Sequence, residues 1–235
     1  MLTIEERGRT RILADRRTRA IATSRRTKIR GIRRFVDALA AFSTSRVLAN
    51  PYRSACCRQN LEAYLAALLN WPYSGHLLVG EAPGERGCAR TGIPFTDERM
   101  LKSGSHPFLK SLRSAVLVAG TTSENTAGIV WNHLCDCQVL PAFWNAVPFH
   151  PRSATGANRM PTRVEVEAGH FFLKQLLSLL SPRWVIAVGR TAEHSLQKIA
   201  ITDFQTVRHP SHGGKREYIA GLNLAGIRSN DAAGR

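Results

Sequence analysis

Acidic residues are scarce in this chain of 235 residues, where 17 Asp and Glu stand against 33 Lys and Arg and the formal charge is +16. A protein this basic attracts polyanions, so nucleic acid is the first partner that the composition indicates. Aromatic residues make up only 7% of the chain and do not alternate with basic residues. This disfavours a surface that binds single strands mainly by base stacking.

Long apolar runs are absent as well. No run approaches the roughly 18 to 20 residues that cross a bilayer, and residues 1–30 contain no signal-peptide-like apolar segment. We therefore expect a soluble, cytoplasmic protein with no membrane partner. A monomer is our expectation for the oligomeric state, on which the sequence itself carries no signal. With 43% hydrophobic and 21% charged residues, the chain can bury a full core, which excludes disorder throughout.

Cysteine is limited to five residues, with one adjacent pair and one C-x-C but no C-x-x-C. An odd number in an intracellular protein favours reduced thiols, so we expect neither a metal site nor a cofactor. The five are Cys56, Cys57, Cys88, Cys135 and Cys137.

The positive charge is concentrated near the start of the chain. Residues 1–36 hold twelve Lys and Arg against three Asp and Glu, a net of +9, which leaves +7 for the rest. Few apolar residues and no sustained period predict a basic arm that is a frayed helix or disordered, followed by one domain at 37–235. Two interpretations of the arm stay open: a phosphate-binding segment, or a solvated leader or over-long gene start.

Beyond the arm, helical and strand periods alternate, which predicts an α/β fold. The best-marked helix begins at Thr162, with Glu165 completing a capping box, and ends at Pro182. Other helices are expected around 61–68 and 191–199, and strands at 76–80, from Phe143, at 184–189 and at 204–207. Together these elements predict a three-layer αβα domain with a central, mainly parallel four-stranded sheet flanked by helices.

Loops rich in small and polar residues follow all four expected strands. In a parallel sheet these loops meet at the carboxyl edge, where ligands bind. They are GEAPG from Gly80, NAVPFHP from Asn145, GRTA from Gly189 and HPSHGG from His209.

Several known catalytic motifs are missing. GEAPGERGCARTG has no Lys and Ser/Thr in P-loop positions, and neither G-x-G-x-x-G nor G-x-S-x-G occurs. Nucleotide cofactors and an α/β hydrolase or nucleosidase acting on small molecules are thereby disfavoured. What remains is Glu81 on a Gly-Ala-Pro-Gly turn, either a solvated loop charge or a carboxylate that directs a water molecule.

Five motifs carry a family resemblance. GEAPG at 80–84, TGIPF at 91–95, NAVPFHP at 145–151, VIAVGRTA at 185–192 and HPS at 209–211 occur in this order. In these motifs the chain resembles the uracil-DNA glycosylase superfamily, nearest to its GEAPG-bearing families, over about residues 76–215.

The resemblance implies a DNA repair enzyme that flips uracil out of single- or double-stranded DNA and hydrolyses its N-glycosidic bond, leaving an abasic site. It implies two catalytic residues. His209 would donate a hydrogen bond to uracil O2, where negative charge develops. Glu81 would position the attacking water and favour the sugar cation.

The remaining implied residues bind the base. The Asn145 amide matches the O4 and N3–H edge of uracil and mismatches that of cytosine, and Phe95 would stack on the flipped base. The other implied substrate-binding residues are Gly80, Ala82, Pro83, Gly84 and Ser211.

The sequence departs from the family pattern in its cysteines. GEAPG glycosylases commonly hold a four-cysteine iron–sulfur cluster, with one Cys four residues after the motif Asn and another on the following helix. Here Phe149 takes the first place and no Cys follows Cys137. The hypothesis is a member of the superfamily without the cluster.

A second departure concerns specificity and the wedge. Family-1 enzymes exclude thymine with a Tyr where this chain has Gly84 and Glu85, so thymine exclusion is unassigned. After HPS that family inserts a Leu into the base stack, whereas this chain reads HGGKREY. The candidate DNA-binding residues there are His212, Gly213, Gly214, Lys215 and Arg216, although Lys215 and Arg216 also fit a solvated helix start.

The competing function is a non-catalytic protein of the same fold that binds single-stranded or damaged DNA. Under that hypothesis the arm and the sheet edge bind DNA strands, and Glu81 has no catalytic role. An assay for base removal separates the two readings.

Overall fold

The computed structural model describes residues 23, 25–211 and 213–228. Its centre is a sheet of four parallel strands in the order β3-β2-β5-β6. The strands are β2 (Tyr73–Gly80), β3 (Leu140–Asn145), β5 (Trp184–Val188) and β6 (Gln205–Val207). All six residues of β3 and the last four of β2 and β5 are buried, as expected for parallel strands covered on both faces. The predicted α/β fold is confirmed.

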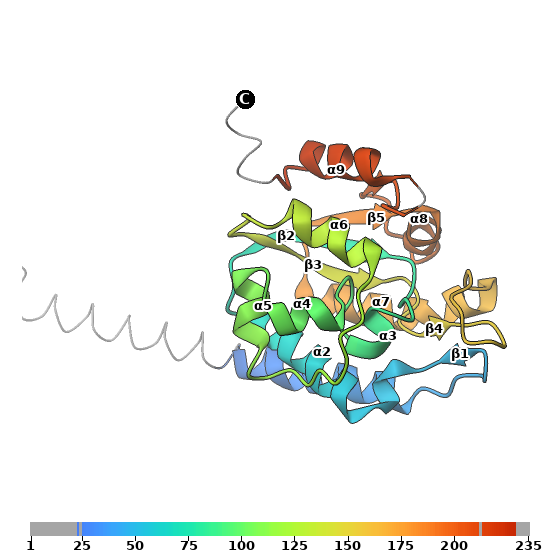
Figure 1. The fold of residues 1–235 in the computed structure, drawn as a ribbon. Coiled ribbons are helices and arrows are strands. Elements are labelled where there is room, and N and C mark those ends of the chain that lie inside the picture. Colours follow the sequence, from blue (N-terminus) through green and yellow to red (C-terminus); the bar gives the residue numbers. More distant parts are fainter. Residues whose placement is uncertain (1–22, 24, 212, 229–235) are drawn as a thin grey trace, which may run out of the picture.

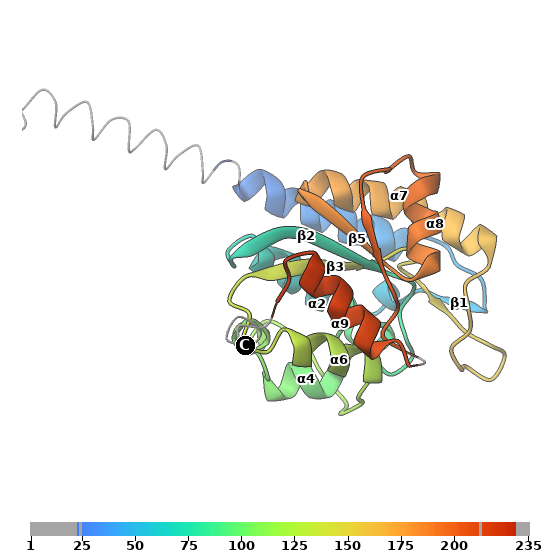
Figure 2. The ribbon, with the colours of Figure 1, turned by 90° about the horizontal axis from the view of Figure 1, so that it is seen from above.

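Helices flank this sheet (Figure 1). Figure 2 shows α7, α8 and a helix at residues 25–41 on one side of the sheet and α4, α6 and α9 on the other. The helices are α2 (Ala55–Leu68), α3 (Cys88–Thr91), α4 (Glu98–Ser103), α5 (Pro107–Leu112), α6 (Asn125–His133), α7 (Arg163–Leu180), α8 (Arg190–Lys198) and α9 (Lys215–Leu224), with the 3-10 turn η1 (Pro51–Arg53).

Helix α7 begins at the capping box that the sequence predicts. The Thr162 hydroxyl accepts the Glu165 backbone N–H, and the Glu165 carboxylate accepts the Thr162 backbone N–H at 2.8 Å. Phe172, Leu173 and Leu176 form its buried stripe. The helix ends at Ser181, which adopts a left-handed φ of 47°, directly before the predicted stop at Pro182.

The helix at 25–41 differs from the sequence prediction. Ile32, Phe35, Val36 and Leu39 recur at helical spacing and are at most 4% exposed. The Phe35 ring lies 5.2 Å from that of Trp144 in β3. The predicted boundary at residue 36 therefore falls inside a packed helix, and Ile32, Phe35 and Val36 of the predicted arm belong to the domain core. The rest of the predicted arm, residues 1–22 and 24, lies outside the described residues.

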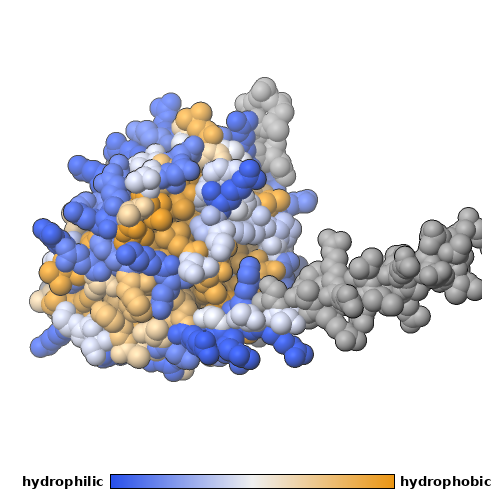
Figure 3. Space-filling model, turned by 180° about the vertical axis from the view of Figure 1, so that it is seen from behind, coloured by the Kyte–Doolittle hydropathy of each residue, from blue (hydrophilic) through white to orange (hydrophobic). Residues whose placement is uncertain are grey.

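Exposed apolar side chains are spread over the surface. They include Val164 and Phe171 on α7, Trp184 at the start of β5, and Leu224 at the end of α9. Seen from behind, hydrophobic areas alternate with hydrophilic ones, so that face is mixed in character (Figure 3). Within the part of the chain that the structure describes, no helix is long and apolar enough to span a membrane.

The sheet topology determines where a site can form. The chain leaves β2 for β3 on one side and then crosses to β5 on the other side of β2. In open α/β sheets such a reversal opens a crevice at the carboxyl ends of the strands. A short antiparallel pair, β1 (Leu48–Ala49) with β4 (His150–Pro151), packs the segment after β3 beside this edge.

Candidate active site

A pocket of about 220 Å³ lies at the carboxyl edge of the sheet. It brings together eight of the nine residues predicted to be catalytic or to bind the base: Glu81, Ala82, Pro83, Gly84, Phe95, Asn145, His209 and Ser211. The ninth, Gly80, is the last residue of β2 and directly precedes Glu81. The pocket also includes Pro151, the last residue of the NAVPFHP motif, and five residues outside the motifs: Cys88, Glu124, Thr126, Asn158 and Arg159.

Glu81 is the first residue after β2 and is half-buried. Its Oε2 accepts a hydrogen bond from the Thr191 hydroxyl at 2.5 Å. Thr191 lies in the first turn of α8, after β5, so the hydrogen bond spans the crevice at the topological reversal. It restricts the carboxylate to one orientation at the pocket wall.

Asn145 ends β3 directly beside Gly80, the last residue of β2, with which it is in register. Its side chain is 5% exposed and lines the pocket. A Cβ added at Gly80 would lie 2.6 Å from the Phe95 ring and 2.8 Å from Asn145 Oδ1. The absence of a side chain at Gly80 therefore lets both groups reach the pocket.

Phe95 adopts a left-handed φ of 56°, which is uncommon for a residue other than glycine. Its carbonyl accepts the Trp131 indole N–H at 2.9 Å, and its ring packs against Phe143 at 5.4 Å. Surrounding contacts of this kind are what maintain a strained backbone at functional sites. They hold the ring at the pocket wall.

His209 has a defined ring orientation. Its Nδ1 accepts the Ser211 backbone N–H at 3.2 Å and lies 2.7 Å from the Ser211 hydroxyl. A ring nitrogen that accepts an N–H carries no hydrogen, so the neutral imidazole holds its hydrogen on Nε2. A Cβ at Gly214 would lie 2.1 Å from the His209 carbonyl, so glycine is required at 214 for this loop to close.

The predicted DNA-binding segment follows His209. Lys215 and Arg216 are exposed and begin α9, with Gly214 as its N-cap, which agrees with the helix-start interpretation. A Cβ added at Gly213 would have no described atom within 4 Å. His212 lies outside the described residues. Whether these residues bind DNA stays a prediction.

Glu124 is a pocket residue that the sequence did not indicate. It precedes α6, and its carboxylate lies against the backbone of the GEAPG loop, since a Cβ added at Gly84 or Gly87 would meet it within 2.2 Å. Burial, with a contribution from the nearby Asp97 carboxylate, raises the pKa of Glu124 to about 7. Asp97 also accepts the Glu124 backbone N–H at 2.9 Å. No local motif surrounds Glu124, so only the fold identifies it.

Two further residues fix the GEAPG loop from the segment after β3. His150 is 4% exposed, and its Nδ1 donates to the Pro83 carbonyl at 2.8 Å. Asn158 Oδ1 accepts the Glu85 backbone N–H at 2.8 Å. The NAVPFHP motif contained His150, but its role became visible only through this contact.

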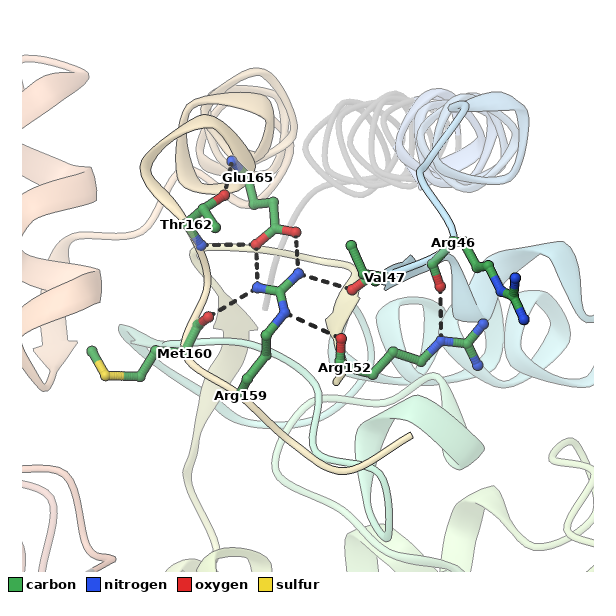
Figure 4. Close-up of polar contacts among 7 residues, drawn as sticks. All are labelled: Arg46, Val47, Arg152, Arg159, Met160, Thr162 and Glu165. Atoms are coloured by element: carbon green, nitrogen blue, oxygen red, sulfur yellow. Dashed lines mark hydrogen bonds and ion pairs between the residues drawn. The ribbon is translucent and has the colours of Figure 1, made fainter. Parts of the chain in front are cut away.

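Arg159 closes one wall of the pocket and is tied to the start of α7 (Figure 4). Its guanidinium forms a two-pronged ion pair with Glu165, at 2.5 and 2.8 Å. It also donates to the backbone carbonyls of Val47, Arg152 and Met160 at 2.9 to 3.1 Å. Hydrogen bonding to Glu165 raises the pKa of Arg159, and the same contact lowers the pKa of Glu165. The charge of Arg159 is therefore neutralised by Glu165, and its guanidinium holds the three backbone segments together.

The position of the expected cluster cysteine is filled by hydrophobic packing. Phe149 is fully buried and stacks on Phe42 with ring centroids 4.9 Å apart. Cys88 and Cys137 are buried at separate places. Cys88 lines the pocket, and the Cys137 thiol donates a hydrogen bond to the Arg228 carbonyl. Among the described residues, no three His, Cys, Asp or Glu gather as metal ligands would. These side chains do not fit an iron–sulfur cluster.

Comparisons with known proteins agree with this architecture. A family model described as "Uracil DNA glycosylase superfamily" matches residues 72–221. The crystal structure of wild-type SMUG2 from Pedobacter heparinus superposes with a TM-score of 0.59 at 16% identity, covering 84% of this chain and 96% of that one. A comparison with curated proteins found no match. The family match covers more than half of the chain and all five motifs, and its members are DNA glycosylases that act on DNA. The chain therefore belongs to the uracil DNA glycosylase superfamily.

Proposed function

We propose that this protein removes uracil from DNA by hydrolysing the bond between the base and the sugar. The C1′–N1 bond breaks, its electron pair leaves with the base, and a water oxygen forms the new bond to C1′. The water gives up a proton to Glu81 or to solvent. The base anion later takes a proton from solvent, so the products are free uracil and an abasic site.

The observation that carries this proposal is the convergence of Glu81, Asn145 and His209 on one small pocket. Its volume of about 220 Å³ is below the roughly 300 to 1,000 Å³ of ordinary ligand pockets. A cavity of this size suits one extruded base better than a whole nucleotide. It stands at the edge where α/β sheets bind ligands.

His209 would stabilise the departing base. Ser211 holds Nδ1 as an acceptor, so the hydrogen of the neutral ring is on Nε2, which is the tautomer that can donate to uracil O2. A donor fixed before the reaction needs no reorganisation as charge develops, and losing one such donor typically costs about 10²- to 10³-fold in rate.

Glu81 would act on the opposite side of the breaking bond. A carboxylate beside C1′ stabilises the sugar cation and accepts a hydrogen bond from the attacking water. The Thr191 hydroxyl occupies one hydrogen-bonding position on Oε2. The other oxygen, Oε1, then has the freedom to bind water.

Asn145 and Phe95 would select the base. The Asn145 amide offers a donor for O4 and an acceptor for N3–H, whereas cytosine presents an acceptor and a donor in the reverse order. Phe95 would contact the face of the ring. Both side chains border the pocket from buried positions, so little freedom is lost when a base enters.

The test is a base-removal assay on uracil-containing oligonucleotides, single- and double-stranded, with alkali to cleave abasic sites. Shortened product is expected from the wild-type protein. We expect Glu81→Gln and His209→Ala to lower the single-turnover rate by about 10²-fold or more, with melting temperatures near that of wild type.

Matched controls come from the same chain. Glu85→Gln removes an exposed carboxylate four residues along, and His194→Ala removes an exposed histidine on α8. Both should keep wild-type rates. DNA binding without shortened product would instead support the non-catalytic alternative, and full activity of either site variant would refute the role given to that residue.

A further inference from the structure

A second hollow lies next to the pocket. It has a volume of about 550 Å³ and is lined by Arg46, Arg152, Ser153 and the backbone as far as Gly156. The same segment of chain serves both cavities, because Pro151, Asn158 and Arg159 line the pocket while Arg152 to Gly156 line the hollow. The hollow and the pocket therefore adjoin the same stretch of chain, residues 151–159.

Two arginines give this hollow its charge. Arg152 Nε donates to the Arg46 carbonyl at 3.1 Å, and the Arg152 backbone N–H donates to Val47 at 3.0 Å. The first bond orients the Arg152 guanidinium, and Figure 4 shows the Arg46 and Arg152 guanidinium groups on the same side, directed away from the Arg159–Glu165 pair. Over the described residues, neither Arg46 nor Arg152 has a carboxylate within ion-pair distance.

The contrast with Arg159 is informative. Arg159 lies only seven residues from Arg152 but is neutralised by Glu165 at 2.5 Å. The fold therefore cancels the positive charge at the pocket wall and keeps two uncompensated charges just outside it. Two arginines held together with no acidic partner repel each other, and an anion between them removes that cost.

The rest of the hollow is formed by a hydrogen-bonded turn at residues 153–157, which carries two hydroxyl groups. The Ser153 and Thr155 hydroxyls lie 2.8 Å apart, and the Ala157 N–H binds the Ser153 hydroxyl at 3.2 Å. Gly156 closes the turn at a φ of +90°, which only glycine adopts without strain. Arg159 anchors both sides of the hollow through the Arg152 and Val47 carbonyls. Arg152 and the turn at 153–157 are thus held in place before any ligand arrives.

We propose that Arg46 and Arg152 bind a backbone phosphate of the DNA strand whose base enters the pocket. Guanidinium groups match the phosphodiester oxygens in geometry and charge. Phosphate contacts of this kind set the register of a protein on DNA without reading its sequence. This inference takes its ligand from the proposed function, and it adds a strand-positioning surface separate from residues 212–216.

The experiment measures DNA affinity by fluorescence anisotropy between about 50 and 200 mM NaCl, using a duplex with a non-cleavable abasic-site analogue. Each lost phosphate contact should reduce the slope of log K against log salt by about 0.9. We expect the slope of the Arg46→Ala/Arg152→Ala variant to fall by about 0.9, because the two arginines contact one phosphate. The corresponding double Lys variant should keep most of the slope because it keeps the charge.

Arg183→Ala is the matched control. Arg183 precedes β5 at the opposite end of the sheet and stacks on Trp184, so its loss should leave the slope unchanged. Thermal unfolding of all variants checks the fold. If the Ala variant gives the same slope as wild type, or falls no further than Arg183→Ala, the phosphate site is refuted.

The outcome for the phosphate site is distinguishable from that for the chemistry. Reduced slope in the Ala variant with no uracil release by the wild type would uphold the phosphate site and refute the proposed reaction. Uracil release by the wild type with an unchanged slope in the Ala variant would uphold the proposed reaction and refute the phosphate site.

Discussion

Replacing Glu124 by Gln should stabilise the protein at alkaline pH. The pKa of Glu124 is raised from 4.5 to about 7, chiefly by burial beside the GEAPG loop and further by Asp97. A carboxyl group with a raised pKa binds its proton more tightly in the folded than in the unfolded chain. The contribution of Glu124 to stability is therefore greatest below pH 4.5 and decreases as pH rises through about 7.

The magnitude follows from the size of that shift. At about 1.4 kcal/mol per pKa unit, ionising Glu124 in the folded protein costs on the order of 3 kcal/mol, and about 2 to 3 kcal/mol of this is incurred between pH 5 and pH 8. Gln has the same shape but no charge. We expect Glu124→Gln to gain about that much free energy of unfolding, relative to wild type, on going from pH 5 to pH 8.

Urea unfolding of both proteins at pH 5 and pH 8 measures this change in the free energy of unfolding of the variant relative to wild type. Glu85→Gln, at an exposed carboxylate, is the control, for which no change is expected. A pH-independent difference between Glu124→Gln and wild type would refute the reasoning. The same substitution has a kinetic consequence under the proposed function. An ionised Glu124 repels the departing base anion, so wild-type excision should slow above about pH 7 while the variant does not.

Two further predictions concern contacts at the edge of the sheet. Thr191→Val removes the hydroxyl that binds Glu81 and should lower kcat by about tenfold or more with little change in KM. Thr191→Ser keeps the hydroxyl and should keep the wild-type rate. Equal rates for the Val and Ser variants would show that the orientation of Glu81 does not depend on this bond. In α7, a Cβ at Gly169 would lie 2.0 Å from the Ala146 carbonyl, so Gly169→Ala should destabilise by about 1 to 3 kcal/mol. Gly128→Ala in α6, with open space around it, should stabilise by about 0.5 to 1 kcal/mol, and urea unfolding that ranks the two in the opposite order would contradict the packing.

The predictable part of the fold rests on signals that are local in sequence. Thr162 and Glu165 cap α7 through residues three apart, and a capping box of this kind is readable without tertiary information. Three of the four strands, β2, β3 and β5, contain buried apolar runs stopped by Gly or Asn, and β6 adds a short segment with one buried residue. The loops at their carboxyl ends could therefore be placed on one edge before any contact was known. That edge is where the pocket lies.

The helix at 25–41 shows why the rest was not predicted. Its four buried residues are scattered among arginines, and the sequence around them resembles a solvated arm. Phe35 becomes a core residue only because Trp144 and Phe172, more than a hundred positions away, pack against it. Burial of a sparse apolar stripe depends on its partners, and a single sequence does not identify them.

The charge distribution around the pocket is likewise a property of the fold. Arg46 and Arg152 are separated by 106 positions and meet because β1 pairs with β4, while Arg159 nearby is neutralised by Glu165. A charge just outside the pocket attracts DNA over roughly a Debye length, about 8 to 10 Å at physiological salt, and is weakened as salt rises. Under the proposed function, a hydrogen bond from His209 to the base would act at contact distance inside the pocket and would be screened much less. Attraction of the strand and departure of the base would then depend on different groups, so we expect the affinity for DNA to change with salt while the rate of the chemical step does not.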